Sequence, residues 1–315
     1  MSAEVVIEQM IMITLLIALG YYAYKKRILT DEGTRGISAL IVTITNPCLM
    51  VYSMLSSEER ISGRGLLIGL LSAVVVYVLL LVMAVFLPIL FRIKKDERYC
   101  YFMLCVFGNI GFIGIPLTNA VLGPDALVYV CFHNLIFSLL IYTLGVRIIS
   151  DAAGEKDREG DVSMSFRRTV LNMINTGTVS AVAALIIYVA GWELPKVIMT
   201  TCDYAGRATT FLSMMVLGAA VARMSVKEAV SNVKLLVFSL IRLLAVPVVI
   251  VFILRLFISD PLTVNTAALM LAVPAGNMPL IMATQHRLDA RTLSDGIILT
   301  TVMSVLTIPV VTLFC

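Results

Sequence analysis

The sequence predicts an all-α integral membrane protein of ten transmembrane helices, arranged as two inverted five-helix repeats in which the fourth helix of each repeat is broken. Three observations predict this fold class. The 315 residues are 60% hydrophobic and 14% charged, whereas soluble domains carry roughly 25% charged residues. Long apolar stretches recur along the whole chain, and two of them contain the same kind of Asn, Gly and Pro interruption. The apolar surplus therefore needs lipid rather than a larger core.

The apolar stretches are long enough to span a bilayer, which takes about 20 residues in a helix. The ten that qualify are Val5–Tyr24, Ile37–Leu55, Gly65–Phe91, Tyr99–Leu122, Ala126–Ile149, Val170–Gly191, Val197–Ala222, Leu235–Ile258, Val264–Gln285 and Leu293–Phe314. The first residues, MSAEVVIEQM, contain no basic region. We therefore expect the first stretch to be a membrane helix of the mature protein rather than a cleaved signal peptide.

The Lys and Arg residues gather in the loops of one predicted side. If the N-terminus lies outside, the cytoplasmic loops hold seventeen of these residues and the outer loops hold four. Positive residues mark cytoplasmic loops, so both termini are expected outside. The lack of an organelle-targeting signal and the short central loop favour a multi-pass protein of a bacterial plasma membrane.

The most polar segment, residues 150–168, is predicted to be a cytoplasmic linker. It separates a first repeat, residues 1–149, from a second repeat, residues 169–315. Because each half crosses the membrane an odd number of times, the second half starts on the opposite side. The halves are therefore predicted to be inverted repeats, as in many secondary transporters.

Two uncharged stretches are interrupted at matching places. Tyr99–Leu122 contains Gly108, Asn109, Gly111, Gly114 and Pro116, and Val264–Gln285 contains Pro274, Gly276, Asn277 and Pro279. Proline removes a backbone donor and clashes with the preceding turn, and glycine makes unwinding easier. At ~1.5 Å per residue, these interruptions lie near the middle of the bilayer. Unwound backbone at that depth must face protein or a watered cavity.

The interruptions predict a binding site for an anion. Proline is favoured in the first turn of a helix, so Pro116 and Pro279 are each expected to start a second half-helix. Helix N-termini carry free N–H groups and partial positive charge, which suit a carboxylate. Asn109 and Asn277 would add side-chain amides without bringing a charge into the membrane. The alternative is that Gly and Pro only kink packed helices, and recurrence at matching positions disfavours it.

A few titratable residues lie inside the predicted helices. Arg207 is near the middle of its helix and should face protein or water. It has two interpretations, which are compatible: an attraction for the anion, or an ion pair with Asp203 one turn earlier. His133 and Asp203 are the candidates for coupling or gating, although packing is the simpler interpretation of a lone histidine. Arg242 is expected to reach the membrane interface by snorkelling from a helix end.

Several function classes lack their motifs. None of the six cysteines forms a CxxC or a Cys/His pair at metal spacing, so no metal or cofactor is expected. No HExxH, paired Asp set or GxxxxGK[ST] loop is present, which disfavours an intramembrane enzyme and ATP-driven transport. The net charge of +4 resides between apolar stretches rather than in a basic surface cluster, so no nucleic acid is expected as a partner.

Four motifs resemble the auxin efflux carrier family, which includes the plant PIN-FORMED carriers and bacterial permeases for malate and malonate. They are Asn46-Pro47, GNIGFIGIPL from Gly108, LSMMVLG (Leu212–Gly218) and VPAGNMPLIMA from Val273. The resemblance covers essentially the whole chain. It implies a scaffold made of the first, second, sixth and seventh helices. It also implies a transport domain made of the third to fifth and eighth to tenth helices, which moves like an elevator and whose fourth and ninth helices cross and hold an organic anion.

The function expected from these features is secondary transport of a small organic anion, such as a carboxylate, across the plasma membrane. The alternative is a receptor or a channel that uses the same cavity. The expected partners are the anion and the lipid bilayer. The resemblance also implies the option of a homodimer formed through the scaffold, and no motif in the sequence distinguishes a monomer from a dimer. The expected substrate-binding residues are Asn109, Gly111, Gly114, Pro116, Pro274, Asn277, Pro279, Asn46 and Arg207.

Overall fold

The computed structural model describes residues 3–56, 61–154, 176–223 and 232–313, and in this part of the chain it contains helices and no strand. The first half contains α1 (Ala3–Lys25), α2 (Asp31–Leu40), η1 (Ile41–Thr45), α3 (Asn46–Leu55), α4 (Gly63–Leu90), α5 (Arg98–Val106), η2 (Ile110–Gly114), α6 (Ile115–Leu122), η3 (Pro124–Ala126), α7 (Leu127–Leu140), η4 (Ile141–Gly145) and α8 (Val146–Ala152). The second half contains α10 (Thr176–Ala190), α11 (Lys196–Arg223), α13 (Val233–Leu240), η5 (Ile241–Ala245), α14 (Val246–Arg255), α15 (Pro261–Ala272), α16 (Met278–Gln285) and α17 (Arg291–Thr312). Most of the predicted linker, residues 150–168, lies outside the described residues.

Several helices are long and apolar enough to cross a membrane. In the described part of the chain six qualify: Asp31–Leu55, Gly63–Leu90, Pro124–Ala152, Lys196–Arg223, Val233–Arg255 and Arg291–Thr312. Four shorter apolar helices accompany them: Ile11–Lys25, Ile110–Leu122, Thr178–Ala190 and Pro261–Ala272. Each of these segments overlaps a different one of the predicted stretches. The prediction of a multi-pass helical membrane protein is confirmed, whereas the ten crossings and the inverted repeat stay predictions.

Widened helical turns explain how prolines fit inside three of these helices. The π-helical segments η1, η2 and η5 each end one residue before an X-Pro pair, at Pro47, Pro116 and Pro247 respectively. A proline in a regular helix lacks a donor and clashes with the carbonyl one turn earlier. A π turn moves that carbonyl by shifting the hydrogen bond to i→i−5. The helix therefore continues past the proline instead of ending there.

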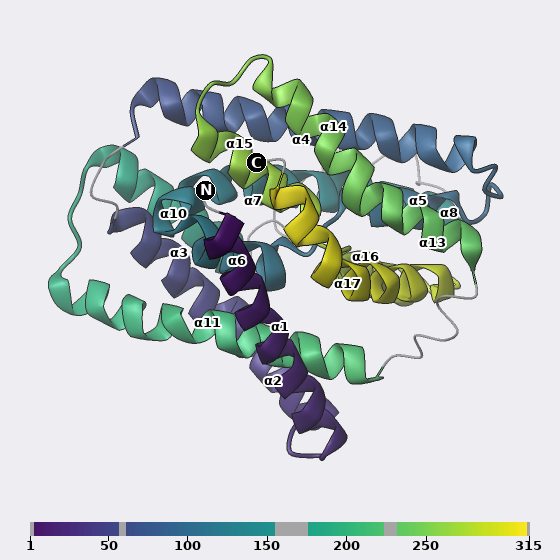
Figure 1. Ribbon diagram of the computed structural model, residues 1–315, viewed down its shortest axis with the longest axis horizontal. Helices are drawn as coiled ribbons and strands as arrows, with labels where there is room; N and C mark the ends of the chain where they lie inside the picture. Colours follow the sequence, from purple (N-terminus) through teal and green to yellow (C-terminus); the bar gives the residue numbers. More distant parts are fainter. Residues whose placement is uncertain (1–2, 57–60, 155–175, 224–231, 314–315) are drawn as a thin grey trace, which may run out of the picture.

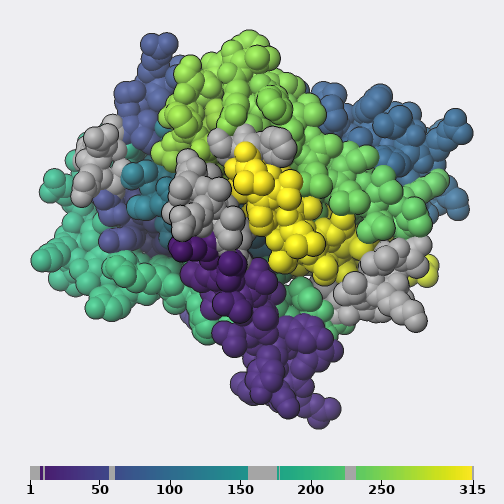
Figure 2. All heavy atoms as spheres, viewed as in Figure 1, coloured from purple at the N-terminus to yellow at the C-terminus, as the bar shows by residue number. Residues whose placement is uncertain are grey.

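The helices pack in two groups, whose members are labelled in Figure 1. In one group, α1 and α3 pack on α11, and α10 packs on α3. In the other group, α4 packs on α5 and α7, while α15 contacts α7, α14 and α17. Buried apolar side chains form a core that extends through both groups. The turn between α1 and α2 projects from the body of the molecule (Figure 2).

Candidate functional site

Both predicted interruptions are present, and they lie against each other. The first leaves residues 107–109 outside the helices between α5 and η2, and the second leaves residues 273–277 outside the helices between α15 and α16. Gly108 and Ala275 form an isolated antiparallel bridge. The two unwound stretches therefore cross in opposite directions, far apart in sequence but adjacent in space.

Backbone hydrogen bonds tie the two stretches together. The Asn109 N–H donates to the Pro274 carbonyl oxygen at 2.8 Å, and the Gly276 N–H donates to the Phe107 carbonyl oxygen at 2.8 Å. These bonds satisfy backbone groups that would otherwise be exposed to a non-aqueous interior, where an unpaired group is costly. The crossing is thus a fixed structural unit.

Glycine is needed at the crossing because the two backbones approach closely. A Cβ at Gly108 would lie 2.8 Å from Cγ2 of Val273, and a Cβ at Gly276 would lie 3.0 Å from the Gly108 oxygen. The second stretch is also held from α17, where the Thr300 hydroxyl accepts a hydrogen bond from the Ala275 N–H at 3.1 Å. Thr300 was not anticipated from the sequence, because a threonine in an apolar helix has no distinguishing pattern.

Asn46 joins the first broken helix to the neighbouring group of helices. Its Nδ2 donates to the Gly111 carbonyl oxygen at 2.8 Å, so it links α3 to η2. The residue is 6% exposed, and its Oδ1 has no hydrogen-bond partner among the described residues. Gly114, further along η2, is buried with the Met270 side chain against it, where a Cβ would come 3.1 Å from the methyl carbon.

The first half-helix restarts earlier than predicted. The expectation that Pro116 begins it is wrong, because η2 already begins at Ile110. The Asn109 side chain caps this start, its Oδ1 accepting a hydrogen bond from the Phe112 N–H at 3.3 Å. The buried Pro116 then fits into the continuing helix because the Ile115 N–H bonds back to the Ile110 oxygen across a widened turn.

The second half-helix, α16, begins as predicted, with Pro279 in its first turn. Asn277 occupies its N-cap position, is exposed, and makes no capping hydrogen bond through its side chain. The first N–H groups of a helix have no partner within it. Asn277 and the start of α16 therefore offer an amide and backbone donors to a ligand, while Pro274 and Pro279 are buried beside them.

Arg242 holds the other ends of the broken helices, which overturns its expected role at the membrane interface. It is 1% exposed. Its Nε donates to the Cys105 oxygen and a terminal nitrogen donates to the Leu271 oxygen, both at 2.6 Å. These carbonyls belong to the last turns of α5 and α15, where intrahelical donors run out. Snorkelling is wrong here because both partners of the guanidinium lie inside the protein.

Arg207 and Asp203 form an ion pair on the surface of α11. The Arg207 Nε lies 2.8 Å from one Asp203 oxygen and a terminal nitrogen lies 2.9 Å from the other. The Arg207 side chain is 74% exposed. The ion-pair interpretation is thus realised, and the attraction of an anion by Arg207 stays a prediction.

Neutralising Arg207 distinguishes its ion pair with Asp203 from the predicted attraction of the anion. We expect Arg207→Gln to leave anion affinity unchanged, because Asp203 already balances this charge and the Arg207 side chain is exposed to solvent. Titration of purified protein with a dicarboxylate, followed by thermal shift, measures affinity and stability together. Asp203→Asn is the matched control, and a selective loss of affinity in Arg207→Gln alone would assign Arg207 to the anion.

His133 is buried in α7 away from charged partners. It is 1% exposed, neither ring nitrogen has a hydrogen-bond partner in the described part of the chain, and its ring centroid lies 6.3 Å from that of Tyr77. These contacts are those of a packed ring. A coupling or gating role for His133 and Asp203 stays a prediction.

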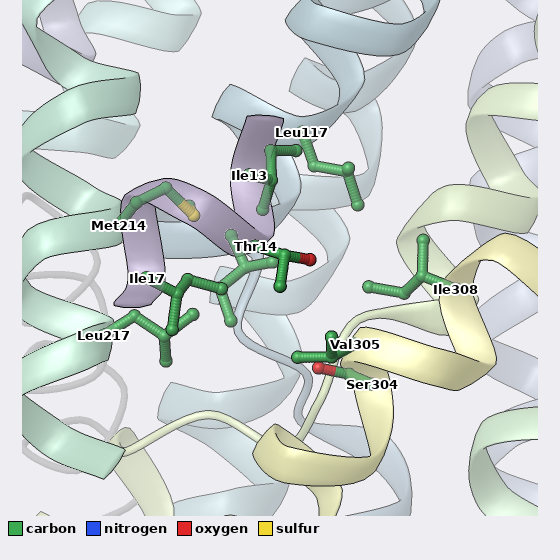
Figure 3. A pocket seen from close by; sticks show the side chains of 10 residues that line it. Ile13, Thr14, Ile17, Leu117, Met214, Leu217, Ser304, Val305 and Ile308 are labelled. Atoms are coloured by element: carbon green, nitrogen blue, oxygen red, sulfur yellow. The ribbon is translucent and has the colours of Figure 1, made fainter. Parts of the chain in front are cut away.

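A mainly apolar pocket lies beside the crossing, between the two groups of helices. It lies between α1 and α11 on one side and η2, α6 and α17 on the other (Figure 3). Its lining is Ile13, Thr14, Ile17, Ile113, Leu117, Met214, Leu217, Ser304, Val305 and Ile308. Because none of the predicted polar site residues lines it, the pocket marks the seam between the groups rather than the predicted anion site.

Comparisons with known proteins relate the chain to membrane transporters. Residues 5–312 match the family model described as "Membrane transport protein". A protein of Rhizobium meliloti named "Putative malonate transporter" is 25% identical over 302 residues, which cover 93% of this chain and 90% of that protein. An uncharacterised transporter of Methanocaldococcus jannaschii is 21% identical over 310 residues, 96% of each chain.

The family match spans nearly the whole chain and includes both broken helices, Asn46 and Arg242. It agrees with the motifs that resemble the auxin efflux carriers and with the six long apolar helices. A family of membrane transporters also implies that the chain is not an enzyme. The chain belongs to the membrane transport protein family, that of the auxin efflux carriers.

Proposed function

We propose that this transporter is a secondary carrier for a small organic anion such as a carboxylate, which binds at the crossing of the two broken helices. The observation that carries the proposal is the crossing itself, with Asn109 N–H bonded to Pro274 and Gly276 N–H bonded to Phe107. It places a capped half-helix start, an exposed Asn277 and the first turn of α16 around one unwound region. Helix starts and neutral amides recognise carboxylates by hydrogen bonding.

The substrate class follows from the charges at the crossing. The predicted polar and glycine residues that lie at or next to it are Asn46, Asn109, Gly111, Gly114 and Asn277, none of which ionises. Among the described residues, the buried charged side chain beside the crossing is the positive Arg242. Such a set favours a negative ligand over a cation. The relative named "Putative malonate transporter" supports a short carboxylate as the first candidate.

We propose that movement occurs between the two groups of helices. The group of α1, α3, α10 and α11 would be the scaffold, and the group that contains α4, α5, α7 and α13 to α17 would carry the crossing. Two features support this division. The seam between the groups in Figure 3 is mainly apolar. The groups are also joined by few polar links, among them the bonds from Asn46 to Gly111, between Ser138 and Thr178, and from Cys131 to the Ala181 oxygen. In an elevator step those links would break and re-form. The proposed location is a plasma membrane with both termini outside, as the loop charges predict.

Counterflow in proteoliposomes tests this function. Vesicles preloaded with unlabelled malonate are expected to accumulate labelled malonate transiently and with saturation, because a carrier exchanges one substrate for another. Vesicles that contain no protein are the control. Binding without flux would identify a receptor, and flux without stimulation by internal malonate would identify a channel; either result contradicts the proposal.

A further inference from the structure

Arg242 lies where the two broken helices present their negative ends. The last carbonyls of α5 and α15 have no intrahelical donor and carry the partial negative charge of a helix C-terminus. The Cys105 and Leu271 oxygens each accept a hydrogen bond of 2.6 Å from this one guanidinium. A single side chain of η5 therefore bridges both broken helices, which are 29 and 137 residues away from it in sequence.

The partial negative charges that face Arg242 belong to backbone carbonyls, not to a carboxylate. Within the described ranges no carboxylate pairs with it, and the titratable side chains that bear on it electrostatically are the thiol of Cys105 and the phenol of Tyr77. Arginine stays protonated in proteins. Among the described residues, this positive charge is thus held inside the molecule by hydrogen bonds to two backbone carbonyls, at 1% exposure.

The guanidinium also lies close to the crossing. A terminal nitrogen of Arg242 would be 3.7 Å from a Cβ built at Gly108, and Asn109 is the next residue. At such distances a charge is poorly screened in a water-poor interior. Its potential therefore acts on whatever binds at the crossing, and a pre-positioned charge acts without reorganisation.

We propose that Arg242 is a positioning and charge-selectivity residue, which clamps the C-terminal ends of α5 and α15 and supplies the fixed positive charge that makes the crossing prefer an anion. The proposal rests on the proposed function and adds the origin of its charge preference. A purely structural clamp would need only hydrogen-bond donors of the right shape. Charge and shape can therefore be separated experimentally.

Chemical rescue separates them. Arg242→Ala removes the guanidinium and leaves room for a small molecule. We expect at least about a tenfold loss of malonate counterflow, with recovery in about 20 mM guanidinium on both sides of the membrane and no recovery in 20 mM urea, which has a similar shape and no charge. These concentrations are far below the molar range that unfolds proteins. Wild-type protein in guanidinium and in urea is the control.

The preference for a charged over an uncharged substrate is a second measurement, and a purely structural role of Arg242 would leave this preference unchanged. We expect wild-type protein to prefer malonate over its uncharged diamide, Arg242→Ala to lose that preference, and guanidinium to restore it. Equal rescue by urea and guanidinium, or an unchanged preference in folded Arg242→Ala, would overturn the proposal.

Arg242→Lys tests the role of the charge if the alanine variant does not fold. Lysine retains the charge and loses the fork of donors, so we expect slower counterflow with the malonate preference retained. A folded lysine variant without the preference contradicts the proposal. If wild-type protein moves no carboxylate, the proposed function fails together with this inference, whereas failure of the variants alone overturns only the role of Arg242.

Discussion

Gly218→Val is expected to prevent stable folding. Gly218 lies where α11 crosses α1, and a Cβ there would overlap the Ile17 carbonyl oxygen and lie 2.6 Å from the Tyr21 nitrogen. Both are backbone atoms, so the two helices must separate to admit any side chain. Overpacking a close contact costs about 1–3 kcal/mol, and more where the backbone has to move. Thermal unfolding in detergent and elution on size exclusion measure the result.

Gly36→Val is the matched control for this prediction. Gly36 lies in α2, and a Cβ there meets no atom within 4 Å. We expect this variant to elute and unfold like the wild-type protein. A Gly218→Val protein that unfolds at the same temperature would show that α1 and α11 do not approach as closely as described.

Asn277→Ala is expected to lower substrate affinity by at least about tenfold without loss of stability. Asn277 is exposed and makes no capping hydrogen bond, so its removal should take away the proposed ligand contact and little else. A hydrogen bond to a charged group contributes about 1.5–3 kcal/mol, and ~1.4 kcal/mol corresponds to a factor of ten in affinity. Thermal shift against a series of mono- and dicarboxylates measures affinity and stability in the same sample.

Asn109→Ala is expected to lower both affinity and stability, because the Asn109 side chain also caps η2 through Phe112. Loss of a cap costs about 0.5–2 kcal/mol. Asn119→Ala, further along the same broken helix, is the control for removing an asparagine from this region. Wild-type affinity in both Asn109→Ala and Asn277→Ala would exclude the crossing as the binding site.

The membrane fold could be predicted because helices that lie in lipid must be apolar, which is visible in the amino-acid composition. A helix in hydrocarbon needs many apolar residues in succession, so hydropathy alone locates it. The two interruptions were also visible in sequence, since Gly108, Gly276 and their neighbouring prolines disfavour a continuous helix. That the two stretches cross and bond to each other depends on packing between distant segments, which the inverted-repeat argument only suggested.

The place where each half-helix restarts was harder to predict. Pro279 begins α16 as expected, whereas Pro116 lies inside a helix that already started at Ile110. Proline marks either a helix start or a position after a widened turn, and the local sequence does not distinguish the two. In the first broken helix the Asn109 cap decided the start, which needed its bond to Phe112 to be seen.

Arg242 could not be placed from sequence because depth along a helix says nothing about which neighbour a side chain faces. Seven residues into an apolar stretch, an arginine can reach either the interface or the protein interior. Its two partners are backbone carbonyls, which leave no trace in residue identity. The partner of Asn46 could not be predicted for the same reason: the Asn-Pro motif is visible in the sequence, but the bond to the Gly111 carbonyl is not.

The most direct test of the crossing as a carboxylate site is malonate counterflow by the double variant Asn109→Ala/Asn277→Ala beside the wild-type protein in matched proteoliposomes. We predict saturable counterflow in the wild-type protein and, in the double variant, a loss larger than the roughly tenfold effect expected for Asn277→Ala alone. Equal protein content and a folded elution profile are checked for both. Undiminished counterflow in the folded double variant would contradict the central claim.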